Sequence, residues 1–165
     1  MKIFSTLSVM LVSILLNPYF AQDTKDKDAI KLNELQVIGS HNSYKIAIEK
    51  PLLNYLVQMN PDIKSLEYEH FPLWQQLDLG LRGLELDVFH DPEGGYYSNP
   101  KGLEIIKASG NSPLPFDQEE KLKVPGLKVF HVQEIDFRSH NLLFMDALVE
   151  LKNWSEANSG HTPII

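Results

Sequence analysis

The sequence predicts an α/β fold built on a parallel sheet. Three apolar stretches, at residues 35–38, 83–88 and 127–132, have the length and composition of buried strands. Helix-forming segments lie between them, and helical crossovers bring successive strands side by side in parallel. The 165 residues suffice for one such domain with one hydrophobic core.

The elements before residue 80 follow from local signals. Pro51 suits the first turn of a helix, and Gly80 ends a second one. The expected order is a strand at 35–38, a polar turn at 39–44, a helix at 52–59 and a helix at 71–79.

The strand at 83–88 has a period of two. Leu84, Leu86 and Val88 face one side, whereas Glu85 and Asp87 face the other. Two like charges on one face are costly to bury without a partner. A cation, an arginine or a proton must therefore balance them.

The remaining elements complete the alternation of strands and helices. Residues 91–126 form a long loop rich in proline and glycine, which holds a short helix at 103–108. A strand at 127–132 follows, and then a helix that Ser139 caps and that runs to Ala157. A further strand begins at 162–165.

The N-terminus has the pattern of a secretory signal peptide over residues 1–21. Lys2 precedes an apolar run at 3–16, which residues 17–21 interrupt. This run is too short for a membrane-spanning helix, so no transmembrane segment is expected after cleavage. We expect a secreted or periplasmic protein with a polar lead-in at 22–34; a buried first helix is the alternative.

Charge and composition exclude several classes of function. The formal charge is −7, and removal of residues 1–21, with one lysine and no acid, makes it −8. An acidic domain of this kind argues against nucleic-acid binding. The chain has no cysteine, which excludes disulfides, zinc–thiolate sites and cysteine nucleophiles.

Polar residues follow each of the three predicted strands. His41 and Asn42 follow the first, Glu85 and Asp87 lie near the end of the second, and His131 ends the third. In parallel α/β folds the carboxyl ends of the strands form the ligand site, so these side chains should converge. Their oxygens suit calcium or magnesium, and their imidazoles suit acid–base chemistry.

Each of these residues also has a purely structural explanation. His41 and Asn42 could be turn residues, the two acids could pair with Arg82, and His131 could be a core histidine. The other histidines lack a strand-end setting and are expected to be surface or packing residues: His70, His90, His140 and His161. The structural explanations do not predict that three strands deliver polar groups at the same end.

Three segments, 38–44, 76–88 and 128–131, resemble the catalytic motifs of calcium-dependent phosphatidylinositol-specific phospholipases C. The resemblance is strongest to the bacterial secreted branch and runs from about residue 35 to residue 165. Further segments that resemble this branch are 91–96, 136–139 and 154–157.

The resemblance implies a TIM-type barrel that cleaves phosphatidylinositol-type phospholipids at a membrane surface. His41 and His131 match the two catalytic histidines of that family, and Asn42, Glu85 and Asp87 match three calcium ligands. The implied reaction is attack of the inositol 2-hydroxyl on phosphorus, with Glu85 as proton acceptor and His131 as proton donor to the leaving oxygen.

A full barrel needs about eight strands, and roughly four are expected here. Residues 35–165 are therefore expected to be the N-terminal half of such a catalytic domain, with a fourth calcium ligand beyond it. Exposed strand edges then predict self-association. Two other functions stay open: a glycerophosphodiester phosphodiesterase-like enzyme, and an inactive secreted fragment or binding module.

Overall fold

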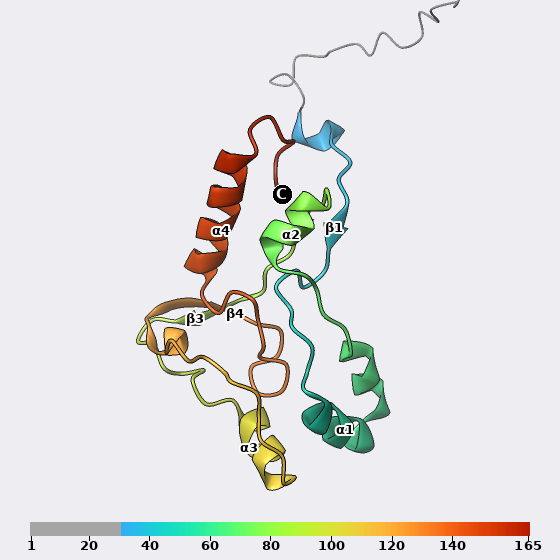
Figure 1. Ribbon diagram of the computed structural model, residues 1–165, viewed down its shortest axis with the longest axis vertical. Helices are drawn as coiled ribbons and strands as arrows, with labels where there is room; N and C mark the ends of the chain where they lie inside the picture. The colour runs from blue at the N-terminus through green and yellow to red at the C-terminus, as the bar shows by residue number, and fades with distance from the viewer. Residues whose placement is uncertain (1–30) are drawn as a thin grey trace, which may run out of the picture. The chain divides into compact units, whose positions relative to one another are not determined.

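The computed structural model describes residues 31–165. It divides the chain into two units, residues 1–36 and residues 37–165. In the first unit the described part holds the 3-10 helix η3 (Leu32–Glu34). The second unit is a mixed α/β structure with two small sheets (Figure 1). The predicted signal peptide and most of the lead-in lie outside the described residues.

The first sheet is parallel, as the sequence predicts. Strand β1 (Gly39–Ser40) pairs with β2 (Gly83–Leu84), and Gly39 lies opposite Gly83. The two backbones are so close that a Cβ on Gly39 would lie 2.7 Å from the Gly83 oxygen. The predicted strand at 35–38 thus begins later, at the glycine that allows this approach.

Residue Ile165 continues this parallel pairing on the other side of β2. Its N–H donates to the Arg82 oxygen over 2.7 Å, and its oxygen accepts from the Leu84 N–H over 2.8 Å. These two bonds have the pattern of a parallel bridge. The chain therefore returns to the β2 edge after its last helix, as expected for a β–α–β unit.

The second sheet is antiparallel, which corrects the prediction of parallel pairing throughout. Strand β3 (Val88–Asp91) pairs with β4 (Gly126–Val129). The connection between them does not cross the sheet: its helix α3 (Lys101–Ala108) packs on α1 (Lys50–Met59) instead. Strand β4 also ends three residues earlier than predicted, because residues 131–136 form a tight turn.

The helices lie where the sequence predicts them, with shifted ends. Helix α1 has Pro51 in its first turn, and α2 (Leu73–Asp78) ends before Gly80, which has φ +97°. Helix α4 (Phe144–Ala157) begins later than predicted, because Ser139 bonds to Asn141 and caps no helix. Helix α2 lies beside α4 (Figure 1). Two further 3-10 helices are η4 (Pro61–Leu66) and η5 (Lys121–Lys123).

The main apolar cluster lies between α1, α3 and the segment around Phe137. Gly102 of α3 is essential to it, because a Cβ there would lie 2.6 Å from Leu52 Cδ2. Its buried members are Ile48, Leu52, Leu53, Leu56, Ile106 and Phe137. Within residues 31–165, no helix is long and apolar enough to cross a membrane.

Candidate functional site

The turn that follows β1 is joined to the segment that follows β2. The Ser43 N–H donates to the Glu85 backbone oxygen over 3.0 Å, and the Glu85 N–H donates to Ser43 Oγ over 2.9 Å. Asn42 has a left-handed backbone, φ +53°, a conformation that asparagine tolerates better than most residues. The two predicted strand ends are therefore joined by one backbone hydrogen bond and by one bond to the Ser43 hydroxyl.

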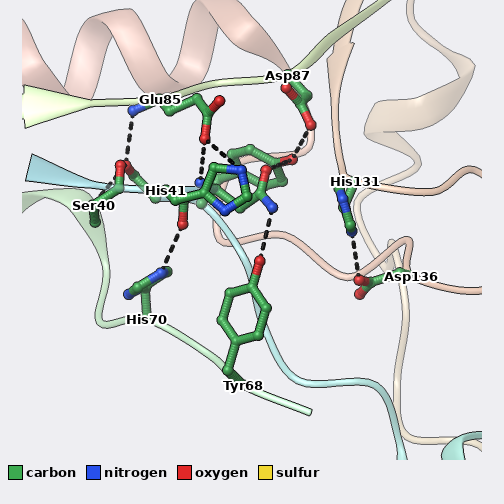
Figure 2. Close-up of polar contacts among 11 residues, drawn as sticks. Ser40, His41, Tyr68, His70, Glu85, Asp87, His131 and Asp136 are labelled. Carbon is green, nitrogen blue, oxygen red and sulfur yellow. Dashed lines mark hydrogen bonds and ion pairs between the residues drawn. The ribbon is translucent and has the colours of Figure 1, made fainter. Parts of the chain in front are cut away.

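The Glu85 carboxylate lies against the backbone of this turn. Its Oε2 accepts a 2.8 Å hydrogen bond from the Asn42 N–H and lies 3.4 Å from His41 Nε2 (Figure 2). The His41 side chain is 76% exposed and that of Glu85 47% exposed. The pair is thus open to a ligand from solvent.

Tyr44 joins the Asn42 and Asp87 side chains. Its hydroxyl lies 3.0 Å from Asn42 Oδ1 and 2.9 Å from Asp87 Oδ2, and its side chain is fully buried. Burial raises the pKa of the Tyr44 phenol far above its ordinary value, and the hydrogen bond to Asp87 and nearby acidic charges raise it further. Tyr44 is therefore a protonated donor. Its hydroxyl holds Asn42 Oδ1 and Asp87 Oδ2 close to each other.

Tyr68 and His70 support the same turn from the segment before α2. The Asn42 amide Nδ2 donates to the Tyr68 hydroxyl over 2.8 Å, which directs the amide oxygen toward Tyr44. His70 Nε2 donates to the His41 backbone oxygen over 2.8 Å, and His140 Nε2 donates to the His70 oxygen over 2.8 Å. His70 and His140, expected to be surface or packing residues, thus brace the backbone of His41.

His131 belongs to a neighbouring group of polar side chains. Its Nδ1 lies 2.9 Å from Asp136 Oδ2, and Asp136 in turn forms a 3.0 Å ion pair with Lys45. Asp136 and Lys45 are fully buried, whereas the His131 side chain is 24% exposed. Figure 2 draws no hydrogen bond or ion pair between the His131–Asp136 pair and the His41–Glu85 group.

Arg82 does not balance the two acids, so the structural ion pair considered from the sequence is wrong. Its guanidinium donates to the backbone oxygens of Leu77 and Leu81 and lies 4.8 Å from the Trp154 ring. Among the described residues it forms no ion pair with Glu85 or Asp87. The acids are held by neutral donors instead, which leaves their negative charge for a ligand.

The sequence predicts that His41, Asn42, Glu85, Asp87 and His131 converge. The structure brings the first four together through the contacts described above, but it places His131 in a separate pair with Asp136. Sequence patterns do not reveal the residues that support this group, because these residues come from other segments of the chain and follow no periodicity. A sequence signal exists for two of them, since Tyr44 and Asp136 lie in segments 38–44 and 136–139, which resemble the phospholipase C family. The supporting residues that sequence patterns do not reveal are Tyr44, Lys45, Tyr68, His70 and Asp136.

The candidate metal ligands are Asn42, Glu85 and Asp87. Within residues 31–165, no group of three or more His, Cys, Asp or Glu side chains could hold a metal ion; this candidate set has two carboxylates and an amide. Its donor atoms are all hard oxygens. Two of them, Asn42 Oδ1 and Asp87 Oδ2, accept hydrogen bonds from the Tyr44 hydroxyl. Such a set fits calcium, which takes six to eight oxygen ligands and accepts water among them.

The comparisons with known proteins give one match. A family model described as phosphoinositide phospholipase C, Ca2+-dependent, matches residues 30–165. No curated protein and no solved structure gives a significant match.

Proposed function

The chain belongs to the Ca2+-dependent phosphoinositide phospholipase C family, and on that premise we propose that it is a secreted or periplasmic phosphoric diester hydrolase. Its proposed substrates are phosphatidylinositol-type phospholipids at a membrane surface. The observation that carries the proposal is the open group of His41, Glu85 and the Tyr44-linked oxygens within the matched region. The location rests on the signal peptide pattern at residues 1–21.

The proposed reaction is an internal displacement at phosphorus. The inositol 2-hydroxyl attacks the adjacent phosphodiester, a cyclic phosphodiester forms, and diacylglycerol leaves. Calcium, when bound, supplies positive charge that lowers the pKa of that hydroxyl and offsets phosphate charge. Asn42, Glu85 and Asp87 would hold it, because their oxygens are its preferred donors.

The protein's own side chains carry the proton transfers. Glu85 accepts the proton of the 2-hydroxyl. Its carboxylate is held in position by the Asn42 N–H, which donates to Oε2 over 2.8 Å. His131 donates a proton to the leaving glycerol oxygen. The exposed His41 stabilises the charge on the pentacoordinate phosphorus, next to the acid that it contacts at 3.4 Å.

We also place the described elements within a TIM-type barrel. The support is the parallel order of β1, β2 and the segment that ends at Ile165: α1 and α2 lie between β1 and β2, and α4 precedes Ile165. Asn42, Glu85 and Asp87 follow the first two of these strands, on the side where barrel enzymes bind substrate. Self-association through strand edges stays a prediction.

The test is ³¹P NMR of phosphatidylinositol vesicles incubated with the chain. We expect a cyclic phosphodiester signal with calcium, its loss in chelator, and its loss in His131→Ala and His41→Ala. His90→Ala is the matched control, because His90 is an exposed histidine of β3 outside this group. Turnover that survives chelator and both variants would contradict the proposal, and hydrolysis of glycerophosphocholine in place of phosphatidylinositol would favour a glycerophosphodiester phosphodiesterase.

A further inference from the structure

We propose that Asp136, balanced by the buried Lys45, is the positioning residue of His131 and fixes its neutral ring as the Nδ1–H tautomer. The inference rests on the proposed function in one respect, the role of His131 as proton donor. It assigns proton donation to a single atom of His131, Nε2. It also assigns a role to the buried Lys45–Asp136 ion pair, which is not among the proposed metal ligands.

The backbone brings His131 and Asp136 together through a tight turn. The N–H groups of His131 and Val132 both donate to the Asp136 oxygen, over 3.2 and 3.1 Å, and the Asp136 N–H donates to the Val132 oxygen over 2.8 Å. The two side chains therefore leave the same short bridge, and Asp136 Oδ2 lies 2.9 Å from His131 Nδ1. This geometry fixes which ring nitrogen faces the acid.

Lys45 places its positive charge beside Asp136, and both side chains are fully buried. Its Nζ lies 3.0 Å from Asp136 Oδ1 and donates to the backbone oxygens of Leu66 and Tyr68 over 3.1 Å each. Asp136 Oδ1 accepts no hydrogen bond from the described residues, so this ion pair is what balances it. A carboxylate accepts hydrogen bonds only, and Nδ1 must therefore carry the proton.

The buried pair is not explained by stability alone. Two apolar side chains of similar volume often stabilise a protein as well as a buried ion pair does, because desolvation of both charges offsets their attraction. What the pair supplies here is a fixed negative charge beside one imidazole nitrogen. That charge selects the tautomer of the neutral ring and stabilises the imidazolium.

The consequence for the reaction is a defined path for one proton. No described residue bonds to His131 Nε2, and the side chain is partly exposed, so Nε2 is the nitrogen available to substrate. In the imidazolium form, the Nε2–H bond breaks as the proton passes to the leaving glycerol oxygen. The ring is then neutral with Nδ1–H still bonded to Asp136, ready to take up the next proton at Nε2.

Asp136→Asn separates positioning from simple packing. The amide oxygen will face the Lys45 cation, because that is the stronger electrostatic partner, and the NH2 group will then face His131 Nδ1. A donor at this position forces the ring into the Nε2–H tautomer and removes the acceptor of the next proton. Asp146→Asn is the control, since Asp146 pairs with Lys121 at a partly exposed position and forms no bond to His131 among the described residues.

The experiment is ¹⁵N NMR of the histidine-labelled chain at about pH 9, where imidazole is neutral. The His131 signals are those missing in His131→Gln. We expect the Nδ1–H tautomer in the unmodified chain and in Asp146→Asn, and the Nε2–H tautomer in Asp136→Asn. On phosphatidylinositol vesicles, kcat of Asp136→Asn should fall about 10²–10⁴-fold, the usual contribution of general acid–base catalysis, with KM little changed.

An Nε2–H tautomer of His131 in the unmodified chain would overturn the inference, even if Asp136→Asn does not fold. A folded Asp136→Asn that keeps the Nδ1–H tautomer would overturn it as well. The proposed function fails separately, if His131→Gln hydrolyses phosphatidylinositol at the original rate. The tautomer is measured without substrate, so the two failures are distinguishable.

Discussion

Tyr44→Phe removes a single oxygen atom and tests the centre of the candidate site. The hydroxyl joins Asn42 Oδ1 and Asp87 Oδ2, and the ring is fully buried, so phenylalanine fills the same space. The substitution therefore leaves packing intact and withdraws only the donor. Any effect on the proposed calcium ligands must arise from the loss of that donor.

The magnitude follows from the two bonds. A hydrogen bond to a charged group such as Asp87 contributes about 1.5–3 kcal/mol, and one between neutral groups about 0.5–1.5 kcal/mol. Because one phenol proton serves both acceptors, we expect the free energy of unfolding without calcium to fall by about 2–3 kcal/mol. Residues that orient metal ligands typically change metal affinity 10–100-fold, which lowers the stabilisation by excess calcium by a further 1.4–2.7 kcal/mol, approximately.

The assay is urea unfolding with chelator and with excess calcium. Tyr55→Phe is the matched control, because Tyr55 lies on α1 with 43% of its surface exposed, and both unfolding energies should stay unchanged. If Tyr44→Phe were as stable as the original chain and gained as much from calcium, the hydroxyl would not organise the ligands. If the free energy of unfolding of the original chain were the same with chelator and with excess calcium, the result would favour a non-catalytic binding module.

Two further substitutions test the framework of the site. Lys45→Met should lower the free energy of unfolding by about 3–5 kcal/mol, because it leaves the buried Asp136 charge without a partner. Lys152→Met, which breaks an exposed pair with Glu156, should cost less than about 1 kcal/mol in the same urea titration, and equal costs would mean that the Lys45 pair is not buried. Gly102→Ala should lower the melting temperature through a cost of about 1–3 kcal/mol, because its Cβ would lie 2.6 Å from Leu52 and 2.7 Å from Phe137. A rise in melting temperature, the usual effect of alanine within a helix, would show that the α1–α3 contact is looser than described.

The sequence predicted the part of the site that depends on strand ends. Asn42, Glu85 and Asp87 converge because β1 and β2 are parallel neighbours and both acids contact the turn after β1 from the segment between β2 and β3, where the predicted strand at 83–88 is interrupted. Period-two alternation and the order of the elements contain this information. The same reasoning located α1, α2, α3 and α4 to within a few residues, since their apolar faces and prolines are local signals.

The sequence did not predict contacts that depend on an irregular segment. Residues 92–125 lack a helix that crosses the sheet, and only the three-dimensional path shows that β3 and β4 run antiparallel. The support of the site was hidden for a similar reason. Tyr68 and Asp136 reach it from loops whose course no periodicity describes.

The turn at residues 40–45 has a consequence for the order in which the protein folds. Its backbone bonds reach Glu85, His70 and His140, which are tens of residues away along the chain. Contacts of such long sequence separation form late, because the intervening loops must first be closed. We therefore expect the candidate site to become native after the helices, whose contacts are close in sequence.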